Sequence, residues 1–453
     1  MKLSPVGRTL CILLACGLPV LAMLACDTSA IIPVYGTPSV LRALTPSAPA
    51  GPDGLQPIPI QVGFGARGPF YEIYFTDPFN PNADNEQGGP DAPLVQAIDQ
   101  ARVSVDMAAY SLNLYSVQMA LIRAEQRGVP VRMVMESDNL DTSSPQALLD
   151  AGIPIVGDKR AGLMHDKFVV IDRSEVWTGS MNFTTAGVYA DNNNLVRIRS
   201  DKVAQDYTVE FEEMFKGNFF GPDVIAATPY SHVTIDGVPL EVYFSPDDHV
   251  ATRIIALLRG AQQSIYFMSY SFTASDFAEV LLQKARQGLA VAGIMEASQV
   301  KIDTGSVYNP FKQAGLPVYL DGNSGEMHHK VFIIDERIVI TGSYNFSLSA
   351  ETTNDENVVI FFDPRIAAQY LAEFQRVNAE RLVEPTSTPN STAGSSSVGT
   401  SSGSSSGAVS SYGSTTSSGA ISSSGATSTY GATTSSGFTS TNYDTSGATT
   451  TGP

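Results

Sequence analysis

The stretch MHHKVFIIDERIVITGSYNF at residues 327–346 occurs a second time in this chain, as MHDKFVVIDRSEVWTGSMNF at residues 164–183. Both copies hold a His and a Lys two residues apart, an Asp five residues after the Lys, and a closing Gly-Ser-x-Asn-Phe. The chain has five histidines, and three of them lie in these two stretches. The duplicated stretch therefore determines both the fold expected for this chain and where its chemistry is sought.

The spacing within each copy brings polar side chains together. Residues two apart in a strand project from the same face, so His328 and Lys330 point to one side of the strand that begins there. The chain turns at Asp335, and the returning strand ends where Ser343 and Asn345 again share a face. The first copy repeats this arrangement at identical spacings with His165, Lys167, Asp172, Ser180 and Asn182.

The repeat extends well beyond this stretch, since residues 94–112 correspond to residues 254–272. Short apolar or β-branched runs alternate with helical apolar spacing in both copies. This alternation predicts an α/β fold with helices covering a largely buried sheet. We expect two such domains, residues 69–218 and 238–384, packed face to face about a pseudo-twofold axis and joined by a connection at 219–237.

The N-terminus differs from this repeat in composition. Residues 1–26 hold Lys2 and Arg8 before a long apolar run, which predicts a signal peptide for export. The end of this run, LAMLAC, resembles a bacterial lipoprotein signal with Cys26 as the lipidated residue, although Met23 stands where Leu is usual. This resemblance implies a protein that is extracytoplasmic and anchored to the cell membrane by acyl chains, or else secreted.

Two further segments are expected to stay outside the folded core. Residues 27–68 are rich in Pro and Gly, which is typical of a tether. Residues 385–453 consist mostly of Ser, Gly, Thr and Ala, a composition that buries too little apolar surface to fold and predicts a disordered tail.

The charge of the chain bears on its partners. It has 27 basic and 45 acidic residues, a formal net charge of −18, and no cluster of Lys and Arg of the kind that binds a phosphate backbone. Nucleic acid is therefore a less favoured partner, and we expect a monomer. No Cys or His cluster has metal-ligand spacing, so neither a metal nor another cofactor is expected, and activity should persist in EDTA.

Each copy offers an imidazole, an ammonium, a hydroxyl and a carboxamide from adjacent strand ends. A fixed cation and neutral donors beside a His suit an anionic tetrahedral group such as phosphate. The His can attack phosphorus or donate a proton, and covalent phosphoryl transfer needs one group for each duty. A duplicated motif supplies both, whereas His329 is expected on the opposite strand face.

Two copies of H-x-K-x-x-x-x-D, each with G-S-x-N seven residues after the Asp, resemble the phospholipase D superfamily over roughly residues 70–380. The resemblance implies two tandem phospholipase-D-like α/β domains with one active site at their interface. In that family one motif His becomes a covalent phosphohistidine and the other protonates the leaving alcohol. Carried over, this favours His165 as nucleophile and His328 as acid, with the opposite order as the alternative.

The resemblance also implies roles for the other motif residues. Lys167, Lys330, Asp172 and Asp335 would complete the two catalytic motifs, although the two Asp residues could instead only close the strand turns. The residues implied in binding or shaping a site for the substrate phosphate are Ser180, Asn182, Ser343 and Asn345.

The family commonly has a downstream acidic residue that orients a catalytic imidazole. Glu356 lies 28 residues after His328, whereas the same offset from His165 gives Asn193. This difference predicts two electronically unequal histidines, with the second copy better supported by its carboxylate. In the alternative, the nearby Asp191 orients His165 in place of Asn193, or the two copies exchange the residues that orient their histidines.

The leading functional hypothesis is hydrolysis or head-group exchange of phospholipids through a phosphohistidine. A nuclease of the same superfamily and a cardiolipin-synthase-like phosphatidyl transferase are alternatives within the resemblance. A surface-displayed, non-catalytic binding module is the alternative from another class, and retained lipid or cell-wall binding without any phosphodiesterase activity would favour it.

Overall fold

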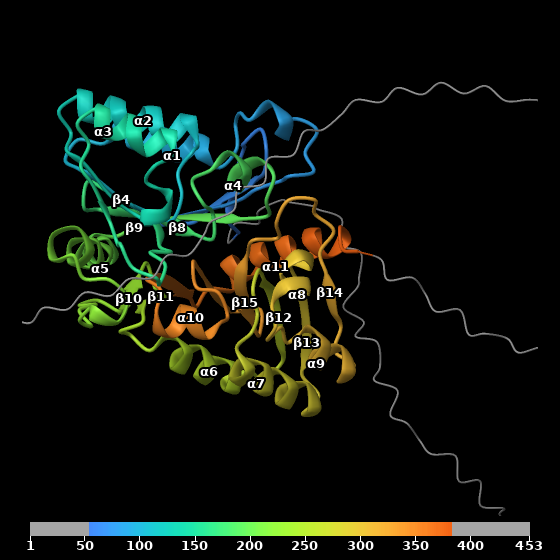
Figure 1. The fold of residues 1–453 in the computed structure, drawn as a ribbon. Helices are drawn as coiled ribbons and strands as arrows, with labels where there is room; N and C mark the ends of the chain where they lie inside the picture. Colours follow the sequence, from blue (N-terminus) through green and yellow to red (C-terminus); the bar gives the residue numbers. More distant parts are fainter. Residues whose placement is uncertain (1–53, 383–453) are drawn as a thin grey trace, which may run out of the picture. The chain divides into compact units, whose positions relative to one another are not determined.

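The computed structural model describes residues 54–382, which contain both copies of the repeat (Figure 1). The predicted signal peptide, Cys26, most of the predicted tether and the predicted tail lie outside the described residues. Within residues 54–382, no helix combines the length and the apolar character that crossing a membrane would need.

The first half is a mixed sheet whose strand order in the described chain is β1-β2-β3-β9-β8-β7-β4-β5-β6. β4, β5 and β6 pair in parallel and the remaining neighbours are antiparallel. The strands are β1 (Gln56–Ile58), β2 (Phe64–Arg67), β3 (Tyr71–Phe75), β4 (Val105–Ala109), β5 (Val131–Met135), β6 (Ile155–Gly157), β7 (Lys167–Ile171), β8 (Glu175–Gly179) and β9 (Asn194–Arg199). The helices are α1 (Asp91–Gln100), α2 (Tyr115–Gln126), α3 (Ser143–Asp150), α4 (Thr185–Tyr189) and α5 (Asp201–Glu212), with short helical turns η1 (Ala83–Asn85), η2 (Ser137–Asn139), η3 (Glu213–Gly217) and η4 (Gly221–Asp223).

The second half repeats this order without a counterpart of β1, as β10-β11-β17-β16-β15-β12-β13-β14. The strands are β10 (His232–Ile235), β11 (Val238–Ser245), β12 (Ser264–Ser269), β13 (Ala290–Met295), β14 (Val318–Leu320), β15 (Lys330–Ile334), β16 (Ile338–Gly342) and β17 (Glu356–Phe361). The helices are α6 (Val250–Gly260), α7 (Ser275–Arg286), α8 (Ala297–Ile302), α9 (Tyr308–Gln313), α10 (Leu348–Thr352) and α11 (Pro364–Ala379). The predicted fold class, a duplicated α/β architecture, is confirmed.

The sheets begin earlier than the predicted domain boundaries. β1 and β2 lie within the predicted tether but pair with β3 as part of the first sheet. β10 lies within the predicted connection at 219–237 but pairs with β11 in the second sheet. The boundaries at 69 and 238 therefore differ from the structure, because short edge strands tolerate the Pro and Gly that suggested a tether.

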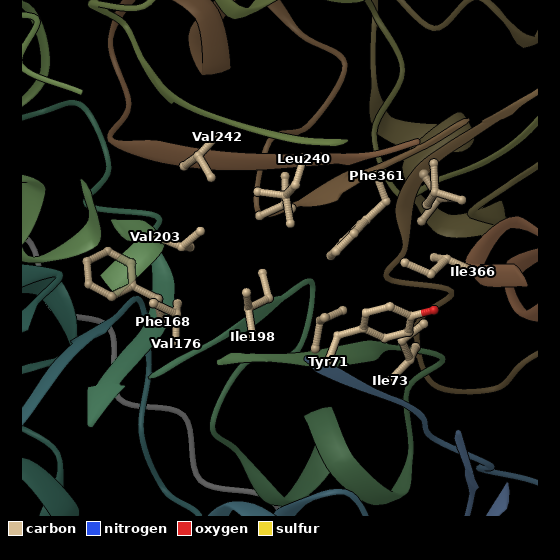
Figure 2. Close-up of a cluster of buried hydrophobic side chains, with 14 of the residues drawn as sticks. Tyr71, Ile73, Phe168, Val176, Ile198, Val203, Leu240, Val242, Phe361 and Ile366 are labelled. Carbon is tan, nitrogen blue, oxygen red and sulfur yellow. The ribbon is translucent and has the colours of Figure 1, made fainter. Parts of the chain in front are cut away.

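Each sheet is covered by helices on its outer face. α1, α2 and α3 pack on the first sheet, and α6 and α7 pack on the second (Figure 1). The opposite faces of the two sheets, together with α5 and α11, share one apolar core. Figure 2 shows Phe168 and Ile198 of the first half facing Leu240, Val242 and Phe361 of the second. This shared core holds the two motif strands at a common interface.

Candidate active site

Each motif histidine is held by a short segment from the opposite half. Met164 forms a parallel bridge with Asp355, and Met327 forms the matching bridge with Asn192. The His165 backbone N–H donates to the Asp355 carbonyl over 3.0 Å, and the His328 N–H donates to the Asn192 carbonyl over the same distance. Glu356 and Asn193, the residues that follow these bridges, therefore lie next to the imidazole of the other half.

The Nδ1 atoms of the two imidazoles consequently have different partners. His165 Nδ1 lies 2.7 Å from Glu356 Oε2, whereas His328 Nδ1 lies 3.0 Å from Asn193 Oδ1. The prediction that the second copy has the better-supported imidazole is wrong, because Glu356 crosses the interface to the first copy. The expected inequality exists, but with the partners exchanged.

Both partners are fixed in turn by buried neighbours. Asn193 donates from Nδ2 to the Gly187 carbonyl over 2.9 Å, which turns its Oδ1 towards His328. Glu356 accepts a hydrogen bond from Asn354 Nδ2 over 3.1 Å. Burial raises the pKa of Glu356 to about 7, while Lys167 and a hydrogen bond from Ser343 act in the opposite direction.

Each motif lysine contacts the backbone of the motif histidine in its own copy. Lys167 Nζ donates to the His165 carbonyl over 2.6 Å, and Lys330 Nζ donates to the His328 carbonyl over 2.8 Å. His165 and His328 are only 6% and 4% exposed. Burial and the two ammonium groups hold the pKa of both histidines well below the usual value, and burial lowers the pKa of Lys167 to about 8. A bound phosphate anion would relieve this concentration of positive charge.

Two tyrosines that the sequence analysis missed complete the arrangement. The Tyr110 ring lies 5.1 Å from the His165 ring, and the Tyr270 ring lies 4.7 Å from the His328 ring. The same rings lie 5.3 and 4.6 Å from the ammonium groups of Lys167 and Lys330. The Tyr-Ser pair that follows β4 and β12 in both copies is a sequence signal that could have identified them.

The two motif serines differ from their predicted role in contacting phosphate. Ser180 Oγ donates to Asn193 Oδ1 over 2.8 Å and accepts from Asn194, and Ser343 Oγ accepts from the Asn357 backbone N–H. Both serines are fully buried. Their hydroxyl groups therefore fix the residues that support the imidazoles.

The motif asparagines are in a different situation. Asn182 and Asn345 are partly exposed, and within the described residues the Oδ1 atom of each is buried without a hydrogen-bond partner. The unpaired Oδ1 is an acceptor and would take a hydrogen bond from a ligand or a water, whereas the Nδ2 group of each amide would donate to a phosphate oxygen. These two residues stay candidates for binding the substrate phosphate.

Asp172 and Asp335, predicted among the catalytic residues, lie at the far ends of β7 and β15 from the histidines. The Asp172 carboxylate accepts the backbone N–H groups of Arg102, Val103 and Ser104, and Asp335 accepts those of the corresponding residues 262–264. A five-residue strand separates each Asp from its Lys by about 15 Å. These contacts support the turn-closing role that the sequence analysis gave as the alternative, because the carboxylates tie one loop to the next.

The residue after each motif His also differs between the halves. His329 is buried on the other side of the strand, where its Nε2 lies 3.1 Å from Glu373 and its Nδ1 lies 3.1 Å from Asn194. The corresponding Asp166 accepts from Asn357 Nδ2 over 2.7 Å. These side chains belong to the packing between the halves. Among residues 54–382, no group of three or more His, Cys, Asp or Glu residues is arranged to hold a metal ion.

The comparisons with known proteins agree with this arrangement. The family described as "Cardiolipin synthase, PLD-like domain" matches residues 94–215 and 254–378, which together make up more than half of the chain. The chain therefore belongs to this family, within the phospholipase D superfamily. Membership supports a phosphodiesterase-type enzyme.

Two curated relatives carry names within this class. The mitochondrial cardiolipin hydrolase of Xenopus tropicalis is 34% identical over 130 residues, which cover 29% of this chain and 61% of that protein. The phospholipase D of Rickettsia prowazekii (strain Madrid E) is 34% identical over 128 residues, covering 28% of this chain and 62% of that protein. The chain thus spans about six-tenths of the length of these relatives.

A solved structure shares the fold over both halves. The phosphatidylserine synthase of Haemophilus influenzae Rd KW20 matches with a TM-score of 0.51 and 12% identity, covering 69% of this chain and 87% of that chain. At this identity the likeness concerns the fold alone.

Proposed function

We propose that this protein cleaves phospholipids as a phospholipase D-type phosphodiesterase, with His165 as the nucleophile and His328 as the general acid. The observation that carries the proposal is the 2.7 Å contact between His165 Nδ1 and Glu356 Oε2. Above the Glu356 pKa of about 7 the carboxylate is ionised and only accepts hydrogen bonds, so it keeps the proton on Nδ1 and leaves the Nε2 lone pair available for attack.

In the first step, His165 Nε2 forms a bond to phosphorus while the bond from phosphorus to the leaving alcohol breaks. The leaving oxygen takes the proton from His328 Nε2. The phosphohistidine carries positive charge on its ring, and Glu356 stabilises that charge at Nδ1. In the second step, water gives a proton to His328 and forms a bond to phosphorus, and the bond to His165 breaks. The products are phosphatidic acid and the free alcohol.

Asn193, the uncharged partner of His328 Nδ1, suits a histidine that acts as the general acid. Asn193 stabilises an imidazolium less than a carboxylate would, and burial with the nearby ammonium groups already lowers the pKa of His328. A histidine with a lowered pKa gives up its proton readily once substrate binding has allowed it to be protonated. The unequal Nδ1 partners therefore favour one order of attack and proton donation.

The remaining groups suit phosphate without a metal. The ammonium groups of Lys167 and Lys330 and the amides of Asn182 and Asn345 would hold the non-bridging oxygens. We propose that catalysis is metal-independent, since these cations take the charge-stabilising role. We also propose, from the sequence alone, that acylation of Cys26 anchors the protein to the outer face of a membrane. Cys26→Ser should release it from a membrane fraction, and retention of this variant would contradict the anchor.

A direct test uses the full chain with EDTA present. Phosphatidylcholine, phosphatidylethanolamine, phosphatidylglycerol, cardiolipin and single-stranded DNA are supplied in parallel, and the release of phosphatidic acid or nucleotides is measured. Lipid cleavage that is lost in both His165→Ala and His328→Ala is the expected result. Cleavage of DNA alone would contradict the lipid substrate, and activity surviving in both variants would contradict the mechanism.

A further inference from the structure

The walls beside the two imidazoles are related by the pseudo-twofold axis but differ in charge at two equivalent positions. Leu163 lies two residues before His165, and Glu326 lies two residues before His328. The Leu163 backbone N–H donates to Asn354 Oδ1 over 3.2 Å, and the Glu326 N–H donates to Asp191 Oδ1 over 3.0 Å. Equivalent positions thus hold two neutral side chains beside His165 and two acidic side chains beside His328.

Glu326 is connected directly to the surroundings of His328. Its Oε1 accepts the Tyr270 hydroxyl over 3.0 Å, and the Tyr270 ring lies against the His328 ring. Burial and Lys167 hold the pKa of Lys330 well below its usual value, and Glu326 is among the acids that oppose this shift. Glu326 is partly exposed, whereas Asp191 is only 8% exposed. The acid that a ligand can reach on this wall is therefore Glu326.

The geometry of an in-line displacement determines which part of the substrate lies next to Tyr270 and Glu326. The attacking nitrogen and the leaving oxygen lie on opposite sides of phosphorus. With His165 as nucleophile, the leaving alcohol stands beside His328, and its substituents extend along Tyr270 and Glu326. In a phospholipase D reaction the leaving alcohol is the lipid head group.

We propose that Glu326 is a specificity-determining residue that selects head groups carrying a positive charge, the amino alcohols ethanolamine and choline. The inference rests on the proposed function, since it requires His328 to be the acid. An ammonium attached two carbons from the leaving oxygen can approach the Glu326 carboxylate and form a charge-assisted hydrogen bond with it.

The same wall disfavours anionic leaving groups. Cleavage of cardiolipin releases an alcohol that carries a second phosphate, which Glu326 would repel. Although a relative is named a cardiolipin hydrolase, Glu326 indicates a different preference for this chain. Phosphatidylglycerol, whose head group is uncharged, stands between the two cases.

The test measures kcat/KM for short-chain phosphatidylethanolamine and phosphatidylglycerol as dispersed monomers, so that no charged lipid surface contributes. The variants Glu326→Gln and Glu326→Lys are compared with Glu279→Gln and Glu279→Lys, which make the same charge changes at an exposed position on α7. Circular dichroism and the unfolding midpoint establish that each variant is folded.

We expect wild-type protein to prefer phosphatidylethanolamine, and Glu326→Gln to reduce that preference about fivefold, the size of one partly exposed ion pair. Glu326→Lys should reverse the preference, while both Glu279 variants keep it. Equal ratios in wild type and both Glu326 variants, with lipid cleavage intact, would overturn the inference and leave the proposed function standing. Absence of cleavage for every lipid in the wild type would overturn both.

Discussion

The two halves of the molecule share one fold and one motif, yet their imidazoles have different surroundings. His165 receives a carboxylate from the second half, and His328 receives a carboxamide from the first. At two equivalent positions, Leu163 and Asn354 beside His165 are replaced by Glu326 and Asp191 beside His328. Both copies keep their reactive groups but differ in the residues around them. One histidine can therefore act as the nucleophile and the other as the general acid of a two-step phosphoryl transfer.

The largest effects are expected from removing the imidazoles themselves. His165→Ala removes the nucleophile and should lower kcat for phospholipid by about 10⁴-fold or more. His328→Ala removes the acid of the first step and the base of the second, and should cost about 10³-fold. With a p-nitrophenyl phosphodiester, whose leaving group needs no proton, the first step should be rescued in His328→Ala, which should release a burst of about one p-nitrophenol per protein, whereas His165→Ala should release none. Equal rescue of both variants would contradict the division of duties.

The unequal Nδ1 partners give the next largest effect. Glu356→Gln keeps the shape but removes the charge that stabilises the phosphohistidine, and kcat should fall by about 10²-fold. Asn193→Ala removes a neutral hydrogen bond and should cost about tenfold. Steady-state kinetics on one lipid measure both. A larger loss in Asn193→Ala than in Glu356→Gln would indicate that the carboxylate is not the more important partner.

A smaller effect, on stability rather than rate, separates the motif aspartates from the site. Asp172→Ala and Asp335→Ala each leave backbone N–H groups unpaired and should lower the free energy of unfolding by about 1–3 kcal/mol. Urea denaturation measures this loss. At a temperature where the variants are folded, kcat should stay close to wild type in both halves. Loss of kcat in a fully folded variant would indicate that the aspartate has a catalytic role.

The smallest effect concerns the acidic wall and pH. Burial raises the pKa of Asp191 from 3.8 to about 7, so the folded protein binds a proton that the unfolded chain releases. This stabilising contribution is complete below pH 4, declines from about pH 4 to 7, and is absent above pH 7. Asp191→Asn, which imitates Asn354 of the neutral wall, should therefore stabilise the protein by about 1 kcal/mol at pH 8 and have little effect at pH 4. Thermal unfolding at the two pH values checks this difference, and a uniform shift at both would contradict it.

The comparison also explains how far the sequence could predict the fold. The α/β class followed from alternating periodicities that recur in both copies, because burial of a sheet between helices imposes that pattern locally. The edge strand β1 and its neighbour β2 were not predicted, because Pro57 and neighbouring Gly residues are typical of a linker as well as of a sheet edge.

The sequence predicted the residues of the site but not which residue contacts each imidazole. His165, Lys167, His328 and Lys330 were identified because strand geometry fixes which residues share a face. The partner of each imidazole depends on a bridge between distant segments, Met164 with Asp355 and Asn192 with Met327, and spacing within one copy contains no information about these bridges. The contacts of Asp172 and Ser180 were not predictable for the same reason, since their partners lie in other segments of the chain.

The central claim is that His165 attacks phosphorus, and trapping the intermediate tests it most directly. Full-length protein is mixed with phosphatidylethanolamine, quenched rapidly into alkaline denaturant that preserves phosphohistidine, and digested for mass spectrometry. The account predicts a phosphatidyl adduct on the peptide containing His165 and no adduct on the peptide containing His328. An adduct on His328, or on neither histidine under conditions of active turnover, would contradict it.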